Sequence, residues 1–269
     1  MACSWTGSTT YITGCVFDGS IQSATGYTTD QCGGFVGWKN GTINVTNCLL
    51  TATFTNIGVG TGSYPSATFV RHGVANDITN SYYVTALGTL QGKERHSITA
   101  DENVIVGFIG TANEYETSGI TAYKDGNTQL PGLLYNNNNN QVLYAGNGDV
   151  VSLTLNHSNL NGYTITDYSA SAGTLENNVL TMPDENVTIT ATLALIDWAT
   201  ESEGDAEHPY MIYNKDQLNL LAYRVNGTHG EPRQSDGYEG KYFKLDADII
   251  YSHTTDWNDA TSIPDFDSL

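Results

Sequence analysis

The sequence is poor in basic residues: 10 Lys and Arg stand against 29 Asp and Glu, which gives a formal net charge of -19. No basic stripe is therefore available to neutralise phosphates, and this argues against nucleic acid as a partner. The same shortage disfavours binding to an anionic membrane surface. Only 14% of the residues are charged, below the ~25% that is usual for soluble domains. Thr, Ser, Asn, Gly and Tyr must supply most of the polar surface.

Long apolar runs are missing too. No stretch approaches the ~20 apolar residues of a membrane-spanning helix, and residues 1–5 lack the basic and apolar parts of a signal peptide. Both ends look cut rather than natural, so we expect a fragment of a longer protein. Disorder is disfavoured, because 39% of the residues are hydrophobic, enough to build cores. This acidic, Thr- and Asn-rich composition indicates an extracellular or cell-surface protein.

Local signatures of catalysis are also lacking. The sequence contains no GxSxG, HExxH or P-loop motif. Its four cysteines include no CxxC pair, which disfavours a cysteine zinc site. Its six histidines, His96 among them, are scattered, and we expect them to be solvated surface residues. The sequence therefore predicts a protein that is not an enzyme.

A repeat of about 33 residues organises the first part of the chain, a period typical of solenoids. One such period separates Trp5 from Trp38 and also Cys15 from Cys48, and a further equal step from Cys48 reaches Ser81. Short segments of alternating polar and apolar residues, separated by Gly and Asn, are typical of strands and turns. One such unit cannot bury its apolar side alone, whereas stacked units share a core, and the repeat therefore predicts a β-solenoid.

The repeat also predicts two structural ladders. Cys15 would lie against Cys48 as a small buried hydrophobic residue, and Trp5 would stack against Trp38 in the core. Disulfide pairing, or a reactive thiol, is the alternative for the cysteines. Asn residues suit the coil corners. The four cysteines are Cys3, Cys15, Cys32 and Cys48.

The segments Cys32–Trp38, Gly41–Ile43 and Val45–Cys48 resemble the GLUG-type repeats of large bacterial surface proteins. The resemblance covers residues 1–90 and implies right-handed β-solenoid coils, at the C-terminal end of such a solenoid. Because Arg71 and His72 replace Gly and Trp in the third copy, we expect Tyr82–Tyr83 to close the last coil.

Residues 91–194 predict a small β-rich module. Its segments Gly162–Thr164, Thr181–Asp184 and Val187–Thr190 resemble bacterial modules related to the internalin B-repeat. In that family such modules are spacers or binding units of surface proteins. Asp101–Val104 also repeats the sequence of Asp184–Val187, and each copy leads into a predicted strand.

Residues 195–269 predict a strand, a helix and a strand. Asn214 is a helix cap, and an apolar stripe at helical spacing follows before Gly227 ends the helix. This order resembles the capping segment that opens bacterial right-handed β-solenoids, so we expect the truncated N-terminal cap of a second solenoid. The stripe consists of Leu218, Leu221, Ala222 and Val225.

Two sets of residues are candidate binding sites. Asp246 and Asp248 would project from the same side of a strand, as a Ca²⁺ site, a glycosidase or lyase pair, or an exposed strand end. Ca²⁺ is the only cofactor for which the sequence gives a candidate site. Exposed aromatic rings could stack on sugar rings. The candidates are Tyr11, Tyr27, Trp38, Tyr64 and Tyr123.

The resemblances imply a non-catalytic adhesin-like or scaffold segment of a secreted or cell-surface bacterial protein. Its partners would be glycans or host or microbial surface proteins. The alternatives are a fragment of a β-solenoid carbohydrate lyase or hydrolase, and a structural spacer. A lyase that needs a basic group is disfavoured, because Lys39 and Arg71 are the only Lys and Arg residues among the first 90.

Overall fold

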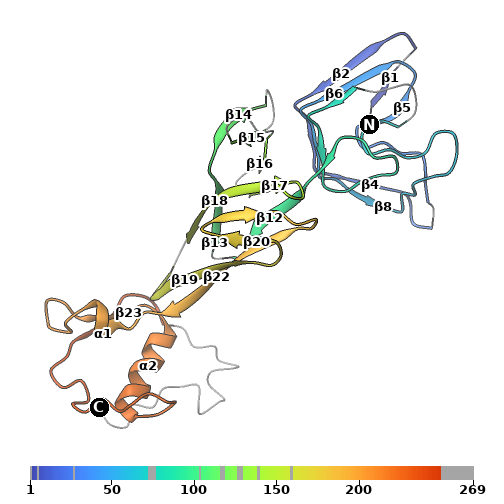
Figure 1. Ribbon diagram of the computed structural model, residues 1–269. Helices are drawn as coiled ribbons and strands as arrows, with labels where there is room; N and C mark the ends of the chain where they lie inside the picture. Colours follow the sequence, from blue (N-terminus) through green and yellow to red (C-terminus); the bar gives the residue numbers. More distant parts are fainter. Residues whose placement is uncertain are drawn as a thin grey trace. The chain divides into compact units, whose positions relative to one another are not determined.

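A computed structural model of the chain is mainly β, as the sequence predicts, with two short helices among the residues that it describes (Figure 1). Residue packing divides it into two compact units, residues 1–156 with 169–190 and residues 157–168 with 191–269. Strands β19 and β22 contribute residues to both units. The structure describes residues 2–4, 6–26, 28–71, 77–102, 104–115, 119–125, 130–137, 140–157 and 160–249.

The first unit begins with a β-solenoid of parallel strands, as predicted. Strands β2, β6 and β9 lie side by side (Figure 1) with Ile12 opposite Val45 and Val45 opposite Ile78, which is the repeat found in the sequence. Three further sets of parallel strands, β3-β7-β10-β11, β4-β8 and β1-β5, form the other faces. The strands are β1 (Ala2–Ser4), β2 (Thr9–Thr13), β3 (Val16–Phe17), β4 (Ser20–Gln22), β5 (Val36–Lys39), β6 (Thr42–Thr46), β7 (Leu49–Leu50), β8 (Thr53–Thr55), β9 (Asp77–Thr79), β10 (Tyr82–Tyr83) and β11 (Lys93–Glu94).

The solenoid core is built by alternation along each strand. Successive residues point to opposite faces, so Ile43 and Val45 are fully buried while Thr42 is exposed. Phe35 and Phe69 continue the core from one coil to the next, with stacked rings whose centroids are 5.6 Å apart.

The Gly-Gly pair that precedes β5 is required by close approach of the next coil. A Cβ atom on Gly33 would lie 2.8 Å from the Arg71 backbone nitrogen, and one on Gly34 would lie 2.3 Å from the Thr68 carbonyl oxygen. The coil is one residue longer at β5 than at β6, since Val36 pairs with Val70 whereas Val45 pairs with Ile78.

The solenoid extends past the predicted closing residues. β11 pairs in parallel with β10, so Tyr82–Tyr83 is not the last strand of its face. Arg95 alone separates β11 from β12, the next strand of the chain. The solenoid therefore passes into the following sheet without a linker.

The β-rich segment after the solenoid forms two sheets, a seven-stranded one in the order β14-β15-β16-β17-β12-β22-β19 and a four-stranded one in the order β13-β18-β21-β20. Leu49 and Tyr82 of the solenoid belong to one apolar cluster with Ile120, Leu133 and Tyr144 of the larger sheet. The strands are β12 (His96–Ala100), β13 (Val104–Phe108), β14 (Thr111–Glu114), β15 (Ile120–Lys124), β16 (Gly132–Asn137), β17 (Asn140–Ala145), β18 (Val150–His157), β19 (Tyr163–Ala170), β20 (Thr174–Glu176), β21 (Val179–Thr181) and β22 (Val187–Leu195).

The second unit contains the predicted strand, helix and strand. The Asn214 side chain accepts a hydrogen bond from the Gln217 backbone N–H at 2.8 Å, and Gly227 ends the helix in the left-handed conformation. Gln217 is almost fully buried, and its amide donates to the Ile196 carbonyl at 3.1 Å while accepting from the Tyr213 N–H at 2.8 Å. The elements are α1 (Trp198–Glu201), β23 (Tyr210–Ile212), α2 (Lys215–Asn226) and β24 (Phe243–Leu245).

An ion pair joins the two helices of this unit. Arg224 of α2 donates two hydrogen bonds, at 2.8 and 2.9 Å, to the carboxylate of Asp197, which caps α1. The guanidinium also lies 5.4 Å from the centroid of the Trp198 ring. Its hydrogen bonds hold the pKa of Asp197 below the usual value of a carboxyl group.

The corner that precedes Cys48 should tolerate Gly better than Ala. Asn47 and Asn80 occupy this corner in successive coils with φ of 55° and 46°, and Gly14 occupies it in the first coil with φ of 63°. Left-handed backbone costs an ordinary residue roughly 1–2 kcal/mol. We expect Asn47→Ala to lower the free energy of unfolding by about 1 kcal/mol and Asn47→Gly to lower it less, measured by urea denaturation. Equal losses for the two variants would contradict this.

Asp197→Asn should show that the ion pair with Arg224 makes a pH-dependent contribution to the free energy of unfolding. Asn still caps a helix, but it removes the charge. We expect a loss of about 1 kcal/mol at pH 7, a modest value because solvent screens a partly exposed carboxylate. Since the folded-state pKa of Asp197 is lowered, its contribution is present above the unfolded pKa of about 3.9 and disappears as the pH falls through the folded value. The free energies of unfolding of the wild type and of Asp197→Asn, measured by denaturation, should therefore converge below pH ~4. A difference that stays constant with pH would rule out the ion pair as the source of the lost stability.

Candidate functional site

The exposed aromatic residue Trp38 lies on the outside of the solenoid. Its side chain belongs to β5 and is 45% exposed, so the predicted stacking of Trp38 in the core is wrong. An irregularity after Ala2 shifts the register of β1, and Cys3 rather than Trp5 is the residue that pairs with Trp38. Trp5 itself lies outside the described residues.

Trp38 and Tyr64 form an exposed aromatic pair. Their ring centroids are 6.1 Å apart with an interplanar angle of 67°, and Tyr64 is also 45% exposed. The guanidinium of Arg71 lies 5.2 Å from the centre of the Trp38 ring. We call Trp38, Tyr64 and Arg71 the aromatic patch.

Arg71 is the buried member of the aromatic patch and holds the segments of the other two in place. It is 5% exposed, and its guanidinium donates three hydrogen bonds to neutral oxygens. These acceptors are the Tyr64 carbonyl at 3.0 Å, the Gly37 carbonyl at 3.2 Å and the Gln31 side chain at 2.8 Å. Because the rigid guanidinium fork binds both segments, the backbone that carries Tyr64 is held beside the strand that carries Trp38.

The other two candidates that the structure describes, Tyr11 and Tyr123, do not join the patch. Tyr11 is 72% exposed, but it lies on β2, where its pairing partner is Asn44. Tyr123 is partly buried against Phe108, with ring centroids 4.3 Å apart. Tyr27 lies outside the described residues. Two of the five candidates, Trp38 and Tyr64, are therefore brought together.

Cys15 and Cys48 occupy equivalent positions in adjacent coils. The Leu49 N–H, directly after Cys48, donates to the Cys15 carbonyl at 2.9 Å. Cys15, Cys32 and Cys48 are free thiols, and burial raises the pKa of the Cys48 thiol to about 11. In the next coil Ser81 takes this position and accepts a hydrogen bond from the Cys48 N–H at 3.2 Å. The position therefore suits any small residue and needs no thiol chemistry.

Asp246 and Asp248 are exposed and follow β24, which ends at Leu245. They do not project from a strand as expected. Asp246 forms an ion pair with Lys244 at 3.3 Å. Within the described part of the chain, neither residue belongs to a group of three potential metal ligands.

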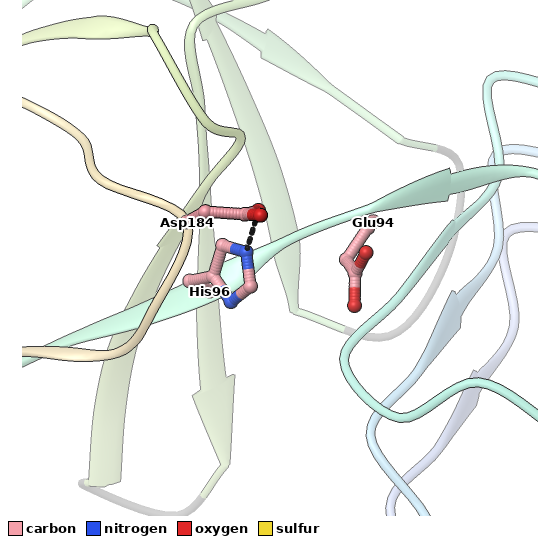
Figure 2. A group of neighbouring side chains, drawn as sticks. All are labelled: Glu94, His96 and Asp184. Carbon is pink, nitrogen blue, oxygen red and sulfur yellow. Dashed lines mark hydrogen bonds and ion pairs between the residues drawn. The ribbon is translucent and has the colours of Figure 1, made fainter.

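One group of potential ligands was not predicted from the sequence. Figure 2 shows Glu94, at the end of β11, and His96, at the start of β12, with Asp184 near them on the loop before β22. One ligand atom from each of the three side chains lies within 4.8 Å of the others. The Glu-x-His spacing, which places both side chains on one face of an extended segment, was the available sequence signal. Nothing local pointed to Asp184, which is 88 residues from His96.

The second unit contains a pocket of about 450 Å³ lined by residues of β19, α1, β23 and α2 and of the segments beside them. Trp198, Tyr213 and Gln217 line it, and Glu201 is the one carboxylate among its lining residues. Glycoside hydrolysis in its usual form uses two carboxylates, so the described lining does not supply that pair.

No helix among the described residues is long and apolar enough to cross a membrane. Comparison of the chain with family models, curated proteins and solved structures gives no match. The resemblances to GLUG-type repeats and to internalin B-repeats therefore stay predictions. The function is inferred from the geometry of the candidate sites.

Thiol labelling should distinguish the two stacked cysteines. Cys48 is 1% exposed and its thiol pKa is about 11, so at pH 7.5 on the order of one molecule in a few thousand carries the reactive thiolate. Cys15 is only partly buried. We expect a maleimide to label Cys15 in the folded protein and Cys48 only after denaturation, as measured by peptide mass spectrometry. Equal rates in the folded protein would show that the coils do not cover Cys48.

Proposed function

We propose that the chain is a non-catalytic, adhesin-like segment of a secreted or cell-surface protein that binds neutral glycans through the aromatic patch. The observation that supports this is the pair of exposed rings, Trp38 and Tyr64, held in place by the buried Arg71. Aromatic faces offer a flat apolar surface with a polar edge, which suits the alternating C–H and hydroxyl groups of a sugar ring.

Rigidity favours this role. Binding costs less when the contacting side chains are already ordered, and three hydrogen bonds to Arg71 order the backbone around the patch. A shallow patch gives weak binding by itself. Repeated display on a long solenoid would raise the overall affinity through multivalency.

The charge of the chain narrows the class of glycan. With a net charge of -19, the protein repels sulfated and other polyanionic glycans at long range. Neutral oligosaccharides carry no such penalty. The proposal is therefore restricted to neutral glycans, and the source would be a host or microbial surface.

A glycan array with the purified chain tests the proposal. We expect saturable binding to neutral glycans, and about tenfold weaker binding after Trp38→Ala, because a stacked aromatic contact contributes ~0.5–1.5 kcal/mol beyond its buried area. Tyr64→Ala should weaken binding as well. Tyr11→Ala is the matched control, since it removes an exposed aromatic side chain outside the patch, and it should leave binding unchanged.

The same array distinguishes the alternatives. Absence of saturable binding to every neutral glycan would contradict the proposal and favour a structural spacer. Release of shortened products from the glycans would favour a carbohydrate-active enzyme. Repeating the array with and without Ca²⁺ tests the predicted role of Asp246 and Asp248, because a Ca²⁺ requirement lost in Asp246→Asn would identify them as ligands.

A further inference from the structure

The Glu94, His96 and Asp184 side chains have the chemistry of a metal site. Imidazole nitrogen and carboxylate oxygen are common ligands of Zn²⁺ and of other first-row divalent ions. Ca²⁺ and Mg²⁺ prefer ligand sets of oxygen alone. A set of one nitrogen and two carboxylates therefore favours the first-row ions.

The distances fit such an ion after a small movement of one side chain. His96 Nε2 lies 3.2 Å from Asp184 Oδ1, close to the ~3.3 Å that separates two ligands of a tetrahedral Zn²⁺ with bonds of about 2.0–2.1 Å. Glu94 is exposed, and its ligand oxygen lies within 4.8 Å of the other two atoms. Figure 2 shows its carboxylate beside the His96–Asp184 pair, so rotation about its side-chain bonds would complete the set.

The surroundings leave the ligands available. The His96 side chain is 13% exposed, and Asp184 Oδ1 is its one hydrogen-bond partner among the described residues. The Glu94 carboxylate makes no hydrogen bond or ion pair in the described part of the chain. Lys93 and Arg95 adjoin Glu94 in the sequence, and the Arg95 guanidinium stacks on the Tyr82 ring at 4.5 Å.

We propose that Glu94, His96 and Asp184 bind one first-row divalent cation such as Zn²⁺, with water as the fourth ligand. Glu94 belongs to β11, the last solenoid strand, His96 begins β12 of the seven-stranded sheet, and Asp184 lies in the loop before β22. The ion clamps the exit of the solenoid to that loop. This site is independent of the aromatic patch and of glycan binding.

Titration of the metal-free full chain with Co²⁺ tests the site. Co²⁺ is chosen because the four cysteines could also bind a metal, and the spectrum of bound Co²⁺ distinguishes thiolate ligands from imidazole and carboxylate ligands. We expect paramagnetic broadening of the His96 imidazole NMR signals and saturation at one ion per chain, without a thiolate charge-transfer band. Loss of an outer-shell partner already weakens metal binding roughly 10- to 100-fold. His96→Gln, Glu94→Gln and Asp184→Asn should each weaken binding by at least about tenfold.

His208→Gln is the matched control. His208 Nδ1 lies 3.3 Å from Asp205, the same kind of pair without a third ligand among the described residues. We expect unchanged affinity. Zn²⁺ at a hundred times its wild-type Kd should raise the melting temperature of the wild type by roughly 5 °C and that of Glu94→Gln by about half as much or less.

Three results would overturn the proposal: no broadening of the His96 signals at millimolar Co²⁺, equal affinity in wild type and Glu94→Gln, or equal weakening by His208→Gln. Glu94 is exposed, so its variant keeps the test valid even if His96→Gln fails to fold.

Discussion

Stacking of parallel coils imposes one constraint on the first unit: each coil must repeat the backbone path of its neighbour, or the hydrogen bonds between coils are lost. The corner at Gly14, Asn47 and Asn80 meets this requirement with left-handed residues in three successive coils. Gly33 and Gly34 meet it by leaving out the Cβ atoms for which the next coil has no room. The alternation of buried and exposed side chains follows from the same path, because each strand repeats its orientation from coil to coil.

Local chemistry made several elements predictable. The Asn corners, the Asn214 cap and the Gly227 terminus of α2 follow from residues that favour one backbone conformation whatever surrounds them. Trp38 could not be placed by the same reasoning. Its predicted position depends on a constant repeat length between β1 and β5, but the register of the chain shifts there, and a one-residue shift already exchanges the inner and outer faces of a strand.

Contacts between distant segments were beyond sequence reasoning. Asp184 meets His96 only because β22 pairs with β12 in the seven-stranded sheet. Arg71 is buried among carbonyl oxygens that no motif connects to it. Gln217 is a polar residue outside the apolar stripe of α2, yet its buried amide forms hydrogen bonds with the backbone groups of Ile196 and Tyr213. In each case a polar side chain owes its role to a fold that has already brought its partners close.

The continuous passage from β11 into β12 has a mechanical consequence. With Arg95 as the single residue between the two strands, tension on the chain at this point cannot be absorbed by extending a slack linker. It passes directly to the hydrogen bonds that hold β11 against β10 and β12 between β17 and β22. A pull along these strands would load several bonds at once instead of breaking them one at a time. A segment built in this way would behave as a stiff element under force.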